Sequence, residues 1–147
     1  DIANSRVARS NIWCLSALGA SILLCGPPPL VPESMAALAP GHCSRCEHLD
    51  EALAQADGVM MLRVQRERGA ARSIGVDYAT AFGLSEARAA RLDPAVPVLH
   101  PGPANKGVEI AAEVYGDPQR SLVREQVTGG VAVRMAVIER SLGHTRF

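Results

Sequence analysis

Apolar positions along the chain alternate between two spacings, short runs typical of buried strands and longer stretches with the period of amphipathic helices. Strands are predicted at residues 20–25, 42–47, 58–63, 96–100 and 121–123. Helices are predicted at residues 6–18, 34–38, 51–56, 73–82, 85–92, 108–115 and 126–142, with a polar loop at 66–70 and with Val131, Met135 and Ile138 at core spacing in the last helix. This alternation predicts an α/β fold, a three-layer Rossmann-like arrangement of a mostly parallel sheet with helices on both faces.

The start of the chain looks like the point at which a strand leads into its helix. Asp1 and Ile2 directly precede a helix that Ser5 can cap, and there is no initiator methionine. We therefore expect the sheet to lack its first strand and the chain to be a fragment of something longer. At 147 residues it has the size of one ordinary domain.

Charge and composition narrow the classes of function. The chain has 15 basic and 15 acidic residues, so no net charge favours binding to nucleic acid or to an anionic membrane. No apolar run approaches the roughly 20 residues that span a bilayer, and no export signal opens the chain, so a cytoplasmic location is expected. The 4 cysteines are spaced unlike a secreted disulfide framework, and free thiols are expected.

Polar groups suited to a small dianionic ligand follow three of the predicted elements, at residues 5–10, 63–65 and 100–103. The carboxyl ends of parallel strands lie along one edge of a sheet, so these loops can face one cleft. Two arginines there could each bind one carboxylate of an amino-dicarboxylic acid through charge-assisted hydrogen bonds. The alternative is an arginine that caps a strand or pairs with a local acid such as Glu67.

Four stretches of the sequence, taken in order and spacing, resemble the second domain of bacterial aspartate carbamoyltransferases. They are residues 1–11, 59–68, 100–110 and 125–137. The resemblance implies that Arg6 binds the α-carboxylate of L-aspartate, that Arg63 binds its β-carboxylate, and that Gln65 supports this site. It also implies that Pro101, Gly102 and Pro103 present main-chain carbonyls to the amide of carbamoyl phosphate and to the incoming amine, whereas His100 is expected to be structural.

The same resemblance implies an activity and a division of labour. The family transfers the carbamoyl group of carbamoyl phosphate to the α-amino group of L-aspartate, giving N-carbamoyl-L-aspartate and phosphate in de novo pyrimidine synthesis, without a metal or organic cofactor. Residues 1–147 match the aspartate-binding C-terminal domain, and the N-terminal carbamoyl phosphate domain is absent. The chain is expected to position substrate and to be inactive alone. The complete chain is expected to form a homotrimer, with regulatory or dihydroorotase-like subunits in some members.

Two other functions stay open at this point. Ornithine carbamoyltransferase shares the fold, but its members typically carry a His-Cys-Leu-Pro loop at the position of residues 100–103, and Arg63 would repel a cationic side chain. A non-catalytic, aspartate-binding paralogue is the second alternative, although the matching aspartate ligands are all present.

A few residues depart from the family pattern or suggest other chemistry. Asn4, Lys106 and Gly129 stand where histidine, arginine and asparagine are common, and Lys106 lacks the fork of a guanidinium. Cys43 and Cys46, with a histidine on each side, suggest half of a zinc site, but no second pair of ligands is found and metal binding is disfavoured. The stretch 128–130 is interpreted as the entry to the last helix.

Overall fold

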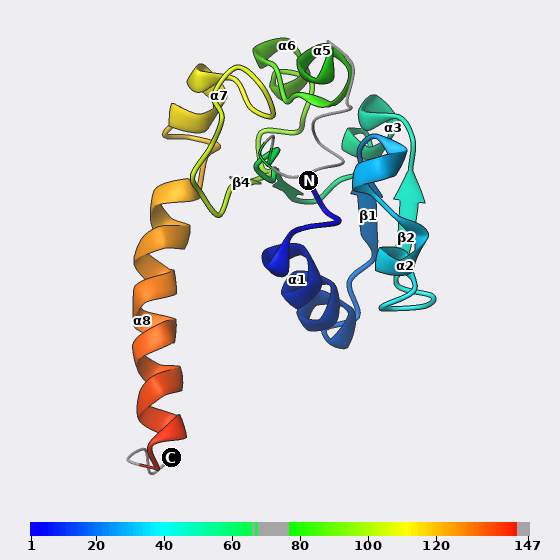
Figure 1. The fold of residues 1–147 in the computed structure, drawn as a ribbon. Helices are drawn as coiled ribbons and strands as arrows, with labels where there is room; N and C mark the ends of the chain where they lie inside the picture. The colour runs from blue at the N-terminus through cyan, green and yellow to red at the C-terminus, as the bar shows by residue number, and fades with distance from the viewer. Residues whose placement is uncertain (66, 68–76, 144–147) are drawn as a thin grey trace.

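The computed structural model describes residues 1–65, 67 and 77–143. Within them the order of elements is α1 (Arg6–Ala17), β1 (Ile22–Cys25), the 3-10 helix η1 (Pro28–Leu30), α2 (Glu33–Ala36), β2 (Cys43–Cys46), α3 (Leu49–Leu53), β3 (Val59–Met60), α5 (Tyr78–Phe82), α6 (Glu86–Ala89), β4 (Val98–Leu99), α7 (Ala112–Gly116) and α8 (Val123–Ser141). The predicted alternation of strands and helices is confirmed (Figure 1). The first part of the helix predicted at 73–82, and most of the loop predicted at 66–70, lie outside the described residues.

All the strands pair in parallel, as predicted, but in two separate pairs. β1 pairs with β2, with Ile22 opposite Cys43, and β3 pairs with β4, with Val59 opposite Val98. The prediction of one continuous sheet is not met in the described residues, where β3 pairs with β4 and forms no ladder with β1. The Val59 N–H donates to the Pro97 carbonyl and the Met61 N–H donates to the Leu99 carbonyl. An isolated parallel bridge joins Val98 to Ser121 and extends the second pair.

Helices cover both faces of the first strand pair. Successive side chains of a strand point to opposite faces. Leu24 packs into a cluster with Ile12 of α1 and Met35 of α2, whereas its neighbour Cys25 packs against a second cluster that includes Leu53 of α3. The second cluster is the larger one and joins β3, β4, α6 and α7 through Val59, Met61, Leu84, Ala89, Leu92, Val96, Val98, Ile110 and Val114. The three-layer α/β arrangement therefore holds.

Two predicted elements near the end of the chain differ from the structure. The helix predicted from residue 108 begins only at Ala112. Its first residues are in extended pairing instead, since the Leu84 N–H donates to the Glu109 carbonyl and the Ala111 N–H donates to the Leu84 carbonyl. The strand predicted at 121–123 is reduced to the single bridge at Ser121, after which α8 begins.

The last helix, α8, extends away from the rest of the molecule (Figure 1). It is 19 residues long and starts before the predicted residue 126, with Glu125 in its first turn, where the helix dipole favours an acid. The stretch 128–130 lies inside the helix and not at its entry. The prediction that Val131, Met135 and Ile138 are core residues is wrong for this chain, since they are 58%, 66% and 54% exposed.

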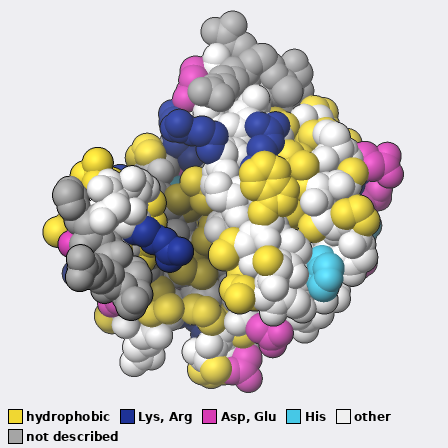
Figure 2. Space-filling model, turned by 90° about the horizontal axis from the view of Figure 1, so that it is seen from below, with side chains coloured by type: hydrophobic (Ala, Val, Ile, Leu, Met, Phe, Trp, Pro, Cys, Tyr) yellow, Lys and Arg dark blue, Asp and Glu magenta, His cyan; other side chains and the backbone are white. Residues whose placement is uncertain are grey.

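The apolar side chains of α8 remain open because little of the chain packs against the helix. Val123, at its first position, is the buried residue of α8. Figure 2 looks at the molecule from the C-terminal end of α8 and shows hydrophobic side chains open to solvent on this face. None of the described helices combines the length and apolar character that crossing a membrane requires.

Candidate functional site

The N-terminal turn of α1 places Arg6 at the start of a well-capped helix. The Ala8 N–H donates to the Ser5 hydroxyl over 3.1 Å, which confirms Ser5 as the cap. Arg6 is the first helical residue and is exposed. No acid lies in the first turn of α1, so no carboxylate of that turn competes for the Arg6 guanidinium or for the helix N-terminus.

The segment after β3 lies directly against this turn. The Asp1 nitrogen donates to the Arg63 carbonyl over 3.4 Å, and the Gln65 amide donates to the Asn4 carbonyl over 3.5 Å. Asn4 in turn donates through its side chain to the Asp1 carboxylate over 3.0 Å. These contacts join the backbone that carries Arg63 and Gln65 to the turn that starts the helix of Arg6.

Arg63 has a local partner in this structure. Its Nη2 lies 3.0 Å from Glu67 Oε1, and the two side chains are 36% and 52% exposed. The pairing with Glu67 that the sequence offered as an alternative therefore exists. An exposed ion pair of this kind contributes only about 0–1 kcal/mol. The convergence of the Arg6 and Arg63 guanidinium groups on one ligand stays a prediction.

The loop after β4 is the third predicted part of the site. The His100 N–H donates to Gln126 Oε1 over 3.1 Å, and the Gly102 N–H donates to His100 Nδ1 over 2.9 Å. Gly102 has a φ of 66°, a backbone conformation that favours glycine, and the Gly102–Pro103 peptide bond is cis. Gly102 and Pro103 are exposed and Pro101 is half-buried, so the loop lies at the surface.

A buried polar network ties this loop to the segment after β3. The side chain of Asn105 donates to the Val64 carbonyl over 2.9 Å. Glu109 accepts the Val64 N–H at Oε2 over 3.4 Å and the Asn105 N–H at Oε1 over 2.5 Å. Hydrogen bonds thus join the turn of Asp1 and Asn4, which leads into α1, to the segment after β3, and join that segment to the loop after β4. This neighbourhood is what the edge of a parallel arrangement predicts.

Glu109 is the functional candidate that the sequence did not indicate. It is fully buried, as is His100, whose Nε2 lies 3.3 Å from Glu109 Oε1. Burial alone raises the pKa of Glu109, but the hydrogen bonds from His100, Asn105 and Val64 together hold that pKa below its usual value. Glu109 is therefore a carboxylate at neutral pH, hydrogen-bonded to His100 and to Asn105 on either side of Pro101.

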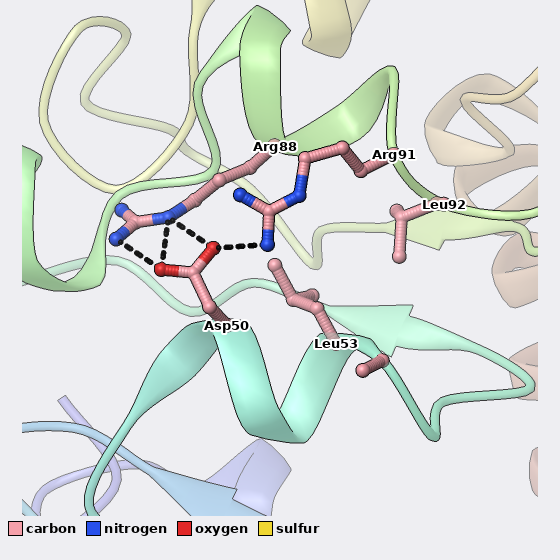
Figure 3. A pocket seen from close by; sticks show the side chains of 6 residues that line it. Asp50, Leu53, Arg88, Arg91 and Leu92 are labelled. Carbon is pink, nitrogen blue, oxygen red and sulfur yellow. Dashed lines mark hydrogen bonds and ion pairs between the residues drawn. The ribbon is translucent and has the colours of Figure 1, made fainter.

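A second polar group, between α3 and α6, has a structural explanation. The carboxylate of Asp50 lies 3.0 Å from Arg88 and 3.1 Å from Arg91 (Figure 3). The hydrogen bond from Arg88 is the main reason that the pKa of Asp50 is lowered. Arg88 also donates to the carbonyl groups of Thr80 and Gly83 at the end of α5, each over 2.8 Å. These groups satisfy one another and join three helices, so they do not form a ligand site.

The remaining candidates of the sequence are accounted for by local contacts. Cys43 and Cys46 are free thiols on β2, and the Cys46 thiol donates to the His48 carbonyl over 3.3 Å. Within residues 1–65, 67 and 77–143, no group of three or more histidine, cysteine, aspartate or glutamate side chains is arranged to hold a metal ion. The ammonium group of Lys106 lies 4.8 Å from the centre of the Tyr115 ring, a cation–π contact.

Comparison with known proteins places the chain. Residues 1–140 match the family model described as the Asp/Orn binding domain of aspartate/ornithine carbamoyltransferase. The chain belongs to the aspartate/ornithine carbamoyltransferase family. It is 51% identical to the aspartate carbamoyltransferase catalytic subunit of Salinispora arenicola, over 97% of this chain and 47% of that protein. It is 48% identical to the same subunit of Myxococcus xanthus, over 95% of this chain and 46% of that protein.

Solved structures of the family share the fold. An ornithine carbamoyltransferase from Burkholderia thailandensis superposes with a TM-score of 0.67 at 23% identity, covering 87% of this chain and 41% of that one. An aspartate transcarbamoylase from Trypanosoma cruzi in complex with carbamoyl phosphate gives a TM-score of 0.63 at 26% identity, covering 80% and 40%. The chain spans about half the length of the relatives it matches, 47% in the case of Salinispora arenicola.

Proposed function

We propose that this chain is the aspartate-binding half of an aspartate carbamoyltransferase, which transfers the carbamoyl group of carbamoyl phosphate to the α-amino group of L-aspartate. The observation that carries the proposal is the hydrogen-bonded junction of the turn at Asn4, the segment at Arg63 and Gln65, and the loop at Pro101. The aspartate carbamoyltransferase catalytic subunits to which the chain is about half identical, at 51% and 48%, support the same reaction.

In the proposed site, two guanidinium groups bind the two carboxylates of aspartate. Arg6 takes the α-carboxylate, Arg63 takes the β-carboxylate, and Gln65 holds the segment of Arg63 against the turn of Asn4. The β-carboxylate replaces Glu67 as the partner of Arg63. Each charge-assisted hydrogen bond is worth about 1.5–3 kcal/mol, enough for two arginines to determine selectivity for a dicarboxylic acid.

The loop of Pro101, Gly102 and Pro103 supplies carbonyl groups to the amide of carbamoyl phosphate and to the attacking amine. The hydrogen bonds of this loop fix its carbonyl directions before substrate binds. The α-amino group attacks the carbamoyl carbon, and the tetrahedral intermediate expels phosphate. Rate enhancement in such a reaction comes from orientation and from donors aimed at developing negative charge. This chain provides the orientation of aspartate.

The donors for phosphate and oxyanion are proposed to come from a second, carbamoyl phosphate-binding half of the complete polypeptide. The relatives are about twice as long as the aligned region, which covers 47% of the Salinispora arenicola subunit. The exposed apolar side chains of α8, among them Val131 and Ile138, are proposed to pack against that half. A cytoplasmic homotrimer, with or without regulatory or dihydroorotase-like subunits, follows from the family resemblance alone.

Aspartate is favoured over ornithine as the acceptor because of charge. A cationic side chain placed beside Arg63 would be repelled, whereas a carboxylate is attracted. The loop at residues 100–103 also lacks the cysteine and leucine typical of ornithine enzymes. The complete enzyme should therefore carbamoylate aspartate and leave ornithine unmodified. A complete protein that binds aspartate but turns over neither acceptor would instead be the non-catalytic paralogue.

Arg63→Ala in the complete catalytic chain tests the assignment. We expect the KM for aspartate to rise at least about 10-fold, since one lost charged hydrogen bond costs about 1.5–3 kcal/mol, with the KM for carbamoyl phosphate nearly unchanged. Arg45→Ala, at an exposed position on β2, is the matched control and should alter neither constant. Equal weakening of both substrates in the Arg63 variant would refute the assignment.

Calorimetric titration of this 147-residue chain with carbamoyl phosphate provides a second test. The proposal places the phosphate donors on the other half, so no strong binding is expected. Tight binding would mean that the phosphate site lies on this chain.

A further inference from the structure

His100 and Glu109 form a buried chain of hydrogen bonds that ends on the main chain of the substrate loop. Both side chains are fully buried. Glu109 Oε1 lies 3.3 Å from His100 Nε2, and His100 Nδ1 lies 2.9 Å from the nitrogen of Gly102. The sequence indicated only a structural role for His100, and the proposed reaction assigns no role to Glu109.

The partners of the ring fix its protonation. The Gly102 nitrogen is a backbone N–H and can only donate, so His100 Nδ1 accepts and carries no proton. The Glu109 carboxylate can only accept, so His100 Nε2 carries the proton and donates it. The imidazole is therefore neutral, in the Nε2–H tautomer, and the carboxylate strengthens Nδ1 as an acceptor.

The direction of the Gly102 N–H determines the direction of a carbonyl group. The Pro101–Gly102 peptide bond is trans. In a planar trans peptide the carbonyl oxygen points opposite to the N–H. Because the Gly102 N–H points at the His100 ring, the Pro101 carbonyl points away from that buried ring.

We propose that His100 and Glu109 are positioning residues for carbamoyl transfer. His100, oriented by Glu109, accepts the Gly102 N–H and thereby directs the Pro101 carbonyl toward the substrate. This inference rests on the proposed function. Glu109 adds a second constraint, because it also accepts the N–H groups of Asn105 and Val64. The carbonyl loop and the segment between Arg63 and Gln65 are thus held by the same carboxylate.

Two substitutions separate the two hydrogen bonds of the ring in the complete catalytic chain. In His100→Gln the side-chain amide is long enough to donate to Glu109 but leaves the Gly102 N–H without an acceptor. In His100→Asn the amide oxygen stands near the position of Nδ1 and can accept from Gly102, but the side chain cannot reach Glu109. His42→Gln, at an exposed histidine before β2, is the matched control.

The expected result is a split between the two substrates. For His100→Gln, kcat falls by up to about 100-fold and the KM for carbamoyl phosphate rises. A displacement of a positioning group by about 1 Å can reduce the rate by this factor. The KM for aspartate stays within about 2-fold, since Arg6 and Arg63 are untouched. His100→Asn regains at least about 10-fold of the lost kcat, because it restores the bond to Gly102.

Other outcomes overturn the inference. A merely structural His100 would lower kcat in proportion to the folded fraction, with both KM values unchanged and with the two variants ranked by their melting temperatures. If neither variant folds, the ¹⁵N spectrum of His100 in the unmodified enzyme decides: the Nε2–H tautomer is expected, and an Nδ1–H tautomer or an imidazolium would disprove the network. An unmodified complete enzyme without carbamoyl transfer would refute the proposed function, whereas this spectrum would still test the network.

Discussion

The α/β body of the molecule and the last helix, α8, both carry regularly spaced apolar side chains, but those of the body are buried and those of α8 are exposed. Ile110 in the body is 1% exposed, and Ile138 in α8 is 54% exposed. The body surrounds its apolar positions with strands and helices of the same chain, whereas α8 leaves the body after Val123. Periodicity therefore identifies a face that is suited to burial, but it does not identify what buries it.

Truncation of the two isoleucines should change the free energy of unfolding by very different amounts, and equal changes would contradict the difference between the body and α8. Ile110→Ala should cost about 2–5 kcal/mol of unfolding free energy, because it deletes a buried side chain and leaves a cavity. Ile138→Ala in the same chain should change stability by no more than about 0.5 kcal/mol, as for a surface substitution. Urea denaturation measures both, and a cost above 1 kcal/mol for Ile138→Ala would show that α8 is already packed.

The same Ile138→Ala change sharpens the comparison when it is made in the complete catalytic chain. If the second half of the enzyme covers α8, the substitution should now cost about 2 kcal/mol or more, because the side chain has become buried. Thr128→Ser, at an exposed position of α8 whose hydroxyl bonds to the Arg124 carbonyl over 3.1 Å, is a mild control. An unchanged cost for Ile138→Ala in the two contexts would refute the docking of this face.

Glycine substitutions should act in opposite directions in the two regions. A Cβ at Gly83 would clash with the carbonyl groups of Ala79 and Val108, so Gly83→Ala should destabilise by about 1–3 kcal/mol. Gly129 lies inside α8 with open space around it, so Gly129→Ala should stabilise by about 0.5–1 kcal/mol through helix propensity. Thermal unfolding of the two variants tests this, and a destabilising Gly129→Ala would mean that another surface approaches the helix there.

The smallest expected effect is on stability at acid pH, where the buried Glu109 is compared with the exposed Glu139 of α8. The folded pKa of Glu109 lies below its unfolded value, so its stabilising contribution is fully present above about pH 4.3 and is lost as pH falls through the lower folded pKa. Glu109→Gln should cost about 1 kcal/mol near neutral pH and flatten the acid limb of the stability curve. Glu139→Gln, at an exposed position of α8, is the control substitution. Parallel curves for Glu109→Gln and the unmodified chain would contradict the role of the carboxylate.

Much of the fold was predictable because its signals are local. Ser5 caps α1 through its own hydroxyl, and Gly83 separates α5 from α6 as its position between two periodic stretches indicated. The start of α7 was not predictable, because residues before Ala112 satisfy their backbone groups with Leu84, which is far away in the sequence. Competition between helical and long-range pairing cannot be resolved from spacing alone.

The candidate site, like the fold, was predictable from the sequence only in part. The three loops were identified by residue type and by their positions after strands, and the structure joins them through Gln65, Asn105 and Glu109. Glu109 has no periodic or compositional signal, since a buried acid and a surface acid look alike in a sequence. Arg88 was likewise indistinguishable from a surface arginine until Asp50 and the end of α5 were found beside it.

By itself the sequence determined the α/β class, the order of elements and the residues proposed to bind aspartate, because these depend on periodicity, capping and motif order along one chain. Only the tertiary structure decided that Glu109 is buried against His100, that Arg63 pairs with Glu67, and that the apolar face of α8 is open. Burial and pairing depend on which distant residues meet, and the free energy of those contacts belongs to the folded arrangement.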